Sequence, residues 1–262
     1  MYKFSSPNIC LSSDDYKEIN EIIKSGQVCL GKNVLLLENI FKTRFKVKYA
    51  ISCASATAGL IISIKAAGIK NMKVALPSFT WPSTLYAIEC NRNTPVFCDI
   101  NKETWLMKVD KKCDAVVPVD TFGAQYENNN ASPNLSIYDA AHGFDLPLLG
   151  HRGLAEVVSL SFTKLVTAMQ GGIILTNDDI FAEKSRELMR LSAKITEVDA
   201  LVAINSIKNY DNLRKVIVGR IIERYNVGFK FEFNTQFGNI NNSVYTILFK
   251  SQGIRNEVSQ NL

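Results

Sequence analysis

Between residues 49 and 177 the chain alternates short runs of β-forming residues with segments of helical character. Parallel strands need long crossovers, and crossover helices cover the faces of the sheet that they connect. The alternation therefore predicts an α/β fold in which a mostly parallel sheet is sandwiched by helices. We predict strands at residues 49–51, 73–76, 95–98, 115–119, 135–138, 157–160 and 173–176.

Helix signals lie between these strands and after them. Residues 58–68 follow a Ser/Thr-rich start, and residues 82–90 open with a proline, which the first helical turn accepts because its N–H groups lack intrahelical partners. A further helix at residues 181–191 follows an aspartate in a capping position. The periodic segment at residues 197–225 favours a long amphipathic helix.

We predict two domains, a large one at residues 1–192 and a reduced small one at residues 193–262. After the long helix, the second domain contains an alternating run at residues 243–249, typical of a strand, and the opening of a helix at residues 254–262. One strand and a short helix bury little surface by themselves, so we expect only the remnant of a C-terminal domain.

Composition excludes several classes of protein. A hydrophobic fraction of 47% over 262 residues is enough for a sizeable core, but no run of 18 apolar residues exists, so we predict no membrane-spanning helix. The first residues lack the apolar block of a secretory signal, and we expect a cytoplasmic protein. A net charge of +5 without a dense run of Lys and Arg argues against nucleic-acid binding.

Side chains that bind metals are sparse and scattered. The six cysteines form no C-x-x-C pair, and the only histidines are His142 and His151. We therefore expect reduced thiols, with neither a disulfide framework nor a metal site.

The first segment that could bind a ligand is the run Ser55, Ala56, Thr57, Ala58 and Gly59, which opens a predicted helix after a predicted strand. Free amides and the positive end of the helix dipole favour a phosphate there, and the hydroxyls of Ser55 and Thr57 can donate to it. A helix capped by a hydroxyl residue, without any ligand, explains the same run.

The second segment is the end of the apolar strand predicted at residues 135–138, where Asp139 is followed by His142. A carboxylate in such a place has little contact with solvent and needs a cationic partner, because an unpaired buried charge is costly. The protonated ring nitrogen of a ligand is one such partner. An aspartate that caps a turn beside a core histidine is the alternative.

The third segment places Lys164 after the strand predicted at residues 157–160 and ahead of the pair Gly171 and Gly172. Apolar surroundings would desolvate the ammonium group, lower its pKa and make the amine a usable nucleophile. A single lysine is far more often a solvated surface group, so what favours a site is the order of all these features along the chain.

A phosphate-type helix start, an aromatic residue at Trp81, a strand-end aspartate and a lysine ahead of two glycines, in this order, resemble one known family. It is the DegT/DnrJ/EryC1/StrS family of sugar aminotransferases, whose members have the type I fold of pyridoxal phosphate (PLP) enzymes. The resemblance covers residues 31–177. It runs through the segments 55–59, 77–81, 94–100, 117–119, 139–142, 155–157, 163–164 and 171–172.

The resemblance implies a role for each residue of the predicted site. Lys164 would hold PLP covalently and later move the substrate proton, and Asp139 would pair with the pyridinium nitrogen. Trp81 would stack on the cofactor ring, and His142 would reach the side of its phenolic oxygen. The cofactor phosphate would be bound by Ser55, Ala56, Thr57 and Ser159.

The resemblance also implies the reaction. L-glutamate would donate an amino group and a nucleotide-linked keto-sugar would accept it, giving an amino sugar nucleotide for surface polysaccharide or a related glycan. Because the family's sites lie between subunits, we expect a homodimer. Where relatives carry a histidine or similar residue three before the lysine, and a glutamate ahead of the glycines, this chain has Ser161 and Gln170.

Two hypotheses of different class stay open. In the first the chain is an active aminotransferase, and in the second it is a truncated or degenerate relative that binds PLP or a partner subunit without transamination. Retention of Asp139 and Lys164 favours catalysis, whereas Gln170 and an end at Leu262 favour degeneration. A nicotinamide-dependent enzyme is disfavoured because no G-x-G-x-x-G follows a strand.

Overall fold

The protein is described by a computed structural model that covers residues 9, 11–109, 112–127, 135–214, 216, 241, 244, 249 and 251–260. Every strand in it overlaps a strand expected from the sequence. The strands are β1 (Tyr49–Cys53), β2 (Lys73–Pro77), β3 (Thr94–Cys98), β4 (Ala115–Val116), β5 (Ile137–Asp139), β6 (Ala155–Ser159) and β7 (Gly172–Thr176).

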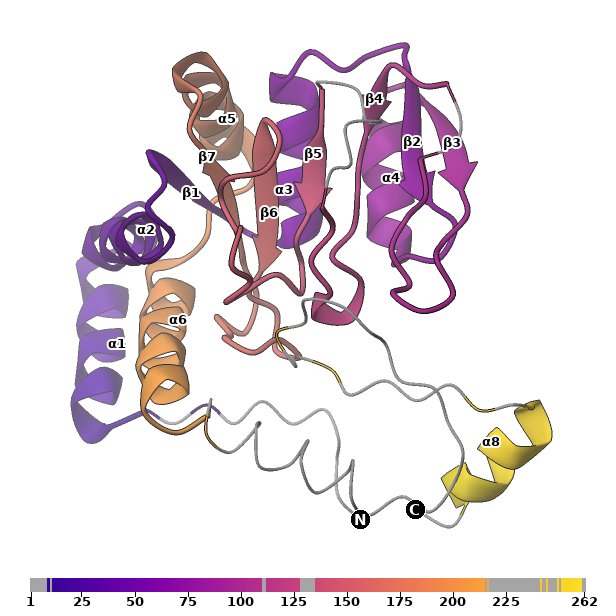
Figure 1. The fold of residues 1–262 in the computed structure, drawn as a ribbon. Coiled ribbons are helices and arrows are strands. Elements are labelled where there is room, and N and C mark those ends of the chain that lie inside the picture. Colours follow the sequence, from indigo (N-terminus) through magenta and orange to yellow (C-terminus); the bar gives the residue numbers. More distant parts are fainter. Residues whose placement is uncertain are drawn as a thin grey trace.

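The strands lie side by side in the order β1-β7-β6-β5 and then β4-β2-β3 (Figure 1). Parallel bridges from Val116 to Ser136 and from Val119 to Asp139 align β4 with β5 and join the two groups. β2 pairs in parallel with β3 and β4, and β5 pairs in parallel with β6, whereas β7 runs antiparallel to both of its neighbours. The prediction of a mostly parallel α/β sheet is confirmed.

Helices flank the sheet, and the sequence predicted only some of them. The expected helices at residues 58–68, 82–90, 181–191 and 254–262 correspond to α3 (Ala56–Ala66), α4 (Pro82–Cys90), α5 (Asp179–Ser192) and α8 (Gln252–Gln260). Two further helices, α1 (Ser13–Ser25) and α2 (Lys32–Phe45), were not expected.

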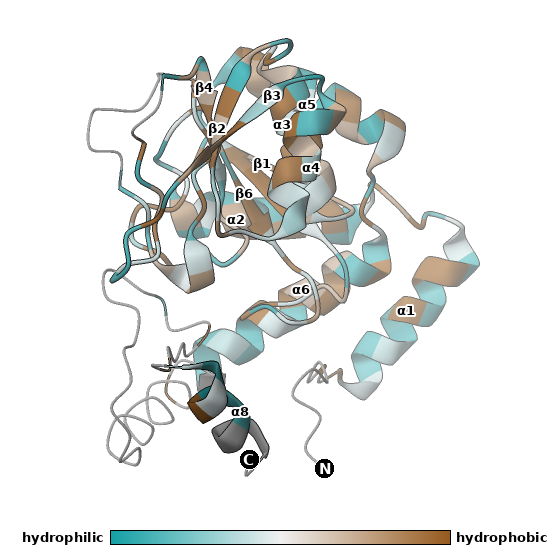
Figure 2. Ribbon diagram, turned by 90° about the vertical axis from the view of Figure 1, so that its right-hand side faces the viewer, coloured by the Kyte–Doolittle hydropathy of each residue, from teal (hydrophilic) through white to brown (hydrophobic). Residues whose placement is uncertain are grey.

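Both faces of the sheet are buried, as a layered α/β fold requires. Along β7, Ile174 contributes to the hydrophobic cluster beneath α3, α4 and α5, whereas Ile173 and Leu175 belong to the cluster beneath α2 and α6 (Glu197–Asn209). In Figure 2 the strands at the centre of the molecule are largely brown, and α1 at the periphery carries long teal stretches.

Two expectations need correction. The strand expected at residues 115–119 is short, because β4 pairs regularly only over Ala115–Val116 before the chain turns into a 3-10 segment at Thr121–Gly123. The helix expected at residues 197–225 is not continuous: α6 ends at Asn209 and a wider π-helical turn follows at Tyr210–Arg214.

The remaining C-terminal expectations are largely untested. Of the strand expected at residues 243–249, only Val244 and Phe249 are described, so this prediction lies outside the described residues. The domain boundary after residue 192 stays a prediction. Among the helices that the structure describes, none is long and apolar enough to cross a membrane, and the same residues contain no cluster of three side chains suited to a metal ion.

A buried carboxylate ties α6 to α2. Glu197, the first residue of α6, accepts hydrogen bonds from the backbone amides of Gly31 (2.7 Å), Asn33 (2.8 Å) and Val34 (3.1 Å) at the start of α2. These amides have no partner within their own helix, and a negative charge complements the helix dipole there. These hydrogen bonds connect α6 to the start of α2, and both helices cover the same face of the sheet.

Glu197→Gln should therefore destabilise the fold. The amide keeps the shape but loses the charge and places an NH₂ group against backbone donors, so we expect the free energy of unfolding to fall by about 2 kcal/mol. Urea denaturation measures this change. Glu183→Gln, on the exposed side of α5, is the control and should change little. Equal effects of the two substitutions would contradict the role of Glu197.

Candidate functional site

Several of the predicted site residues lie at the edge of the sheet where the parallel strands end. β5 ends at Asp139, β6 ends at Ser159, and β1 leads into Ser55 at the start of α3. Open α/β sheets bind ligands at this edge. Because β7 runs antiparallel, its first residue, Gly172, lies at the same edge and pairs with Ser159.

The start of α3 offers unpaired backbone donors. Ser55 caps the helix, since its hydroxyl oxygen accepts from the amide of Ala58 at 3.1 Å. In the described part of the chain no acceptor lies on the amides of Ala56 and Thr57. A Cβ at Gly172 would lie 2.7 Å from the nitrogen of Ala56, so only glycine leaves this corner open. The corner suits an anion such as a phosphate.

Asp139 is a buried acid with few partners. Its side chain is 3% exposed, Oδ2 accepts from the hydroxyl of Thr84 at 2.7 Å, and Oδ1 accepts from the amide of Ala141 at 3.2 Å. Burial raises the pKa of Asp139, and no ion-pair partner for it is found among the residues that the structure covers. The site therefore holds a carboxylate that a ligand cation could neutralise.

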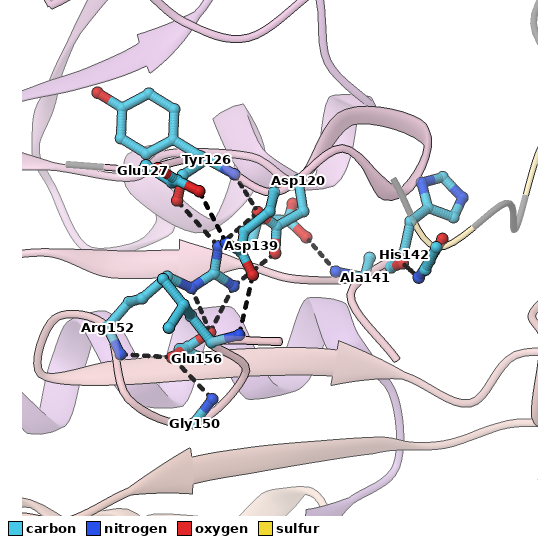
Figure 3. Close-up of polar contacts among 12 residues, drawn as sticks. Asp120, Tyr126, Glu127, Asp139, Ala141, His142, Gly150, Arg152 and Glu156 are labelled. Atoms are coloured by element: carbon cyan, nitrogen blue, oxygen red, sulfur yellow. Dashed lines mark hydrogen bonds and ion pairs between the residues drawn. The ribbon is translucent and has the colours of Figure 1, made fainter. Parts of the chain in front are cut away.

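The neighbouring strand-end acid, Asp120, contrasts with Asp139 because it is fully paired. Arg152 donates to Oδ1 and Oδ2 of Asp120 at 2.8 and 2.7 Å and also contacts Glu156 (Figure 3). Its guanidinium carbon lies 4.7 Å from the ring centre of Tyr138. Two buried carboxylates around one guanidinium form a structural network. The N–H groups of Arg152 bond to Asp120, Glu156 and the carbonyl of Tyr126, so none is directed at Asp139.

Lys164 and His142 form a close pair next to Asp139. Nζ of Lys164 lies 2.8 Å from Nε2 of His142. Burial lowers the pKa of Lys164, although the charge of Asp139 acts in the opposite sense. Burial and the nearby lysine lower the pKa of His142 to about 3, so the imidazole is neutral and can accept a hydrogen bond from the amine.

Contacts on other sides fix His142. The ring of Phe122 lies 6.0 Å from the imidazole at an interplanar angle of 33°, and Phe122 packs in turn against Phe79 and Trp105. Asn241, far along the chain, donates through Nδ2 to the carbonyl oxygens of His142 (2.5 Å) and Phe144 (2.6 Å). A C-terminal residue thus reaches the same loop.

The other expected residues differ in exposure. Ser159 is buried, and its hydroxyl oxygen accepts from the amide of Ser161 at 3.3 Å. Trp81 stands immediately before α4 with 78% of its side chain exposed, and no contact joins it to Lys164 or His142 in the described residues. Gln170 is exposed beside the two glycines. The stacking role expected of Trp81 stays a prediction.

Sequence reasoning missed several residues around Asp139. Asp120 could have been found, because it directly follows the expected strand at residues 115–119, as Asp139 follows its own. Thr84, one helical turn into α4, and Arg152, in a loop, carried no signal, since only the folded chain brings them to the carboxylates.

Comparison with known proteins identifies the family of the chain. A family model described as the DegT/DnrJ/EryC1/StrS aminotransferase family matches residues 10–211, which is more than half of the chain. The chain belongs to this family. The resemblance carried by Asp139, Lys164 and the helix start at Ser55 is thereby confirmed at the level of the family.

One curated protein similar to the chain is the uncharacterized protein MJ1066 of Methanocaldococcus jannaschii. It is 30% identical over 197 residues, which cover 68% of this chain and 51% of the relative. The chain thus spans about half the length of that relative. The match by itself assigns no activity to the chain.

Solved structures share the fold. DesI, crystallised in the presence of its TDP-sugar product, aligns with a TM-score of 0.84 and 23% identity over 98% of this chain and 76% of its own. The sugar aminotransferase CalS13 from Micromonospora echinospora aligns with a TM-score of 0.86 and 18% identity, over 100% of this chain and 84% of its own. An E. coli GDP-4-keto-6-deoxy-D-mannose-3-dehydratase with bound hydrated PLP aligns with a TM-score of 0.82 and 18% identity, over 100% of this chain and 82% of its own.

Members of the DegT/DnrJ/EryC1/StrS family depend on PLP. The residues present fit that cofactor in three ways. The corner beside Gly172 is open at unpaired amides, where a phosphate fits, and Asp139 is a buried carboxylate without a cation, where a pyridinium fits. Lys164 supplies a partly desolvated amine of the kind that binds an aldehyde.

Asp139→Asn and Asp120→Asn should have opposite effects on stability. The first removes a buried charge that no ion pair neutralises, so the free energy of unfolding should stay the same or rise at neutral pH. The second breaks the network around Arg152 and should lower the free energy of unfolding by about 3 kcal/mol. Urea denaturation of the PLP-free protein compares the two. If both variants lose the same stability, Asp139 is a structural residue like Asp120.

His142→Gln should flatten the pH dependence of stability. The pKa of His142 is about 3 in the folded protein and 6.5 by itself, so between these values the unfolded chain binds a proton that the folded chain does not. The free energy of unfolding should fall as the pH drops below 6.5, by up to about 1.4 kcal/mol per pH unit from this group. Glutamine cannot titrate, so the variant should lose less between pH 7 and pH 5.

The wild-type protein and the His142→Gln variant are compared in the same urea series at each pH. A His142→Gln variant with the wild-type slope would show that the imidazole does not titrate as its burial requires.

Proposed function

We propose that this chain is a PLP-dependent aminotransferase that converts a nucleotide-linked keto-sugar to an amino sugar. The observation that carries the proposal is Asp139, a buried carboxylate without an ion-pair partner in the described residues, in the electrostatic range of the half-buried amine of Lys164. Both groups match the chemistry of the family to which the chain belongs.

Asp139 would keep a proton on the ring nitrogen of the cofactor. A carboxylate that accepts from Thr84 and Ala141 has lone pairs left for one more donor, and its burial makes that interaction strong. When bound, PLP supplies an electron sink that makes the α-proton of an amino acid labile, and a protonated ring nitrogen strengthens it.

Lys164 would hold the cofactor through Nζ and, once released by an amino acid, move the proton at the α-carbon. A pKa below the usual lysine range leaves more of the amine unprotonated at neutral pH, as both tasks require. His142 would orient Nζ by accepting its hydrogen bond at 2.8 Å. Phe122 packs against the imidazole, and the pair is partly shielded from solvent.

The cofactor phosphate would bind the free amides of Ala56 and Thr57, with the hydroxyls of Ser55 and Ser159 close to the same corner. Trp81, exposed ahead of α4, would contribute its ring to the cofactor face on binding. These assignments follow the family resemblance residue by residue.

L-glutamate is the proposed amino donor and a nucleotide-linked keto-sugar the proposed acceptor, for surface polysaccharide or a related glycan. Relatives of the same fold support this substrate class: DesI was crystallised with its TDP-sugar product, and CalS13 is a sugar aminotransferase. A cytoplasmic homodimer is the proposed working form.

Reduction with borohydride tests the assignment of Lys164. After incubation of the protein with PLP, borohydride should fix a pyridoxyl group on Lys164, and peptide mapping by mass spectrometry locates it. L-glutamate should convert the bound cofactor to the pyridoxamine form and release 2-oxoglutarate, which absorbance and a coupled assay follow. A panel of keto-sugar nucleotides should then identify the acceptor that regenerates PLP.

Two variants make this result specific. Lys164→Ala should fold normally but take up no label, whereas Lys184→Ala, on the exposed side of α5, should behave as wild type. A label without conversion by L-glutamate would support the alternative, a relative that binds PLP without transamination. Absence of a label in well-folded wild-type protein would overturn the proposed function.

A further inference from the structure

A chain of two hydroxyl groups leads from the site's rim to Asp139. Thr84 is fully buried on α4 and donates through Oγ1 to Oδ2 of Asp139 at 2.7 Å. The hydroxyl of Thr80, in the partly exposed loop before the same helix, lies 3.0 Å from the hydroxyl of Thr84. The contact between Thr84 and Asp139 joins positions 55 residues apart in the chain.

The charge of Asp139 fixes the direction of this chain. A carboxylate accepts hydrogen bonds only, so the single hydroxyl hydrogen of Thr84 must point to Oδ2. Thr84 then has only lone pairs left for Thr80, and Thr80 must donate to Thr84. Each hydroxyl polarises the next, which strengthens the bond to the carboxylate.

The bond between Thr84 and Asp139 is not required by local structure. A threonine near the start of a helix often uses its hydroxyl on its own backbone. Thr84 instead directs its hydroxyl to another element, and its backbone amide bonds separately to the carbonyl of Trp81 at 3.1 Å. The stronger donor on Asp139 is thus a side chain, because the second bond, from the amide of Ala141, is longer at 3.2 Å.

We propose that Thr84 is a positioning residue for the cofactor ring: its hydroxyl, oriented by Thr80, fixes Oδ2 of Asp139 and keeps the carboxylate charged and correctly turned for the ring nitrogen. This inference rests on the proposed function, because it takes Asp139 as the partner of that nitrogen. Without Thr84, burial would shift Asp139 towards its protonated form. A neutral carboxyl group lacks the charge that stabilises a protonated ring nitrogen.

The test follows the ring nitrogen directly. The protein is loaded with PLP labelled with ¹⁵N in the ring, and the ¹⁵N chemical shift reports whether that nitrogen is protonated. Wild type should give the protonated signal. Thr84→Val, similar in shape but without a donor, should move the signal towards the unprotonated value and weaken PLP binding about tenfold, as loss of a hydrogen bond to a charged group predicts.

Matched variants separate positioning from packing. Thr84→Ser keeps the donor and should restore the wild-type signal, and Thr80→Val should shift it in the same direction by a smaller amount. Thr176→Val removes a buried hydroxyl that donates to the carbonyl of Leu154 at the far end of β7, so it should lower stability without moving the signal.

Each outcome decides between the proposals. A Thr84→Val protein with the wild-type signal and affinity overturns the role of Thr84 while leaving the proposed function intact. If Thr84→Val does not fold by near-UV circular dichroism, Thr80→Val decides, and an unchanged signal there overturns the inference. A wild-type protein that binds PLP with an unprotonated ring nitrogen overturns the role of Asp139, and the inference fails with it.

Discussion

The site depends on a carboxylate that the fold buries without neutralising. Asp139 lies at the end of β5 with two hydrogen-bond donors, while the guanidinium of Arg152 is bound to the adjacent Asp120. A chain optimised for stability alone would pair both acids or replace one, because an unpaired buried charge is costly. One acid, Asp120, has an ion-pair partner, and its neighbour Asp139 has none among the described residues. This arrangement is expected of a site that binds a cation.

The sheet supplies the rigid frame that this arrangement needs. With both faces covered, β5 and β6 are fixed by packing, so Asp139 and Ser159 have little freedom. The antiparallel β7 matters because it brings its first residue, Gly172, rather than its last, to the same edge. There the absence of a side chain leaves the first amides of α3 accessible, so the direction of one strand opens the corner for an anion.

The sequence predicted the strands, the fold class and the residues at strand ends, because strand-forming runs and their termini are local properties. Sequence reasoning missed α1, a helix with mostly polar residues and only Ile22 buried. It also extended the helix at residues 197–225 past Asn209, where the backbone widens into a π-helical turn. Thr84 and Arg152 were out of reach for a different reason. Their importance arises from contacts across 55 and 32 positions of the chain, which no local pattern encodes.

Burial acts on the charges of the site in one consistent sense. It raises the pKa of Asp139 and lowers those of Lys164 and His142, so each group is pushed towards its neutral form when the cofactor is absent. A pyridinium beside Asp139 would oppose this shift for the acid, because a nearby cation favours the carboxylate. The hydroxyl of Thr84 acts in the same sense as such a cation, because its hydrogen bond to Oδ2 lowers the pKa of Asp139 and favours the charged form.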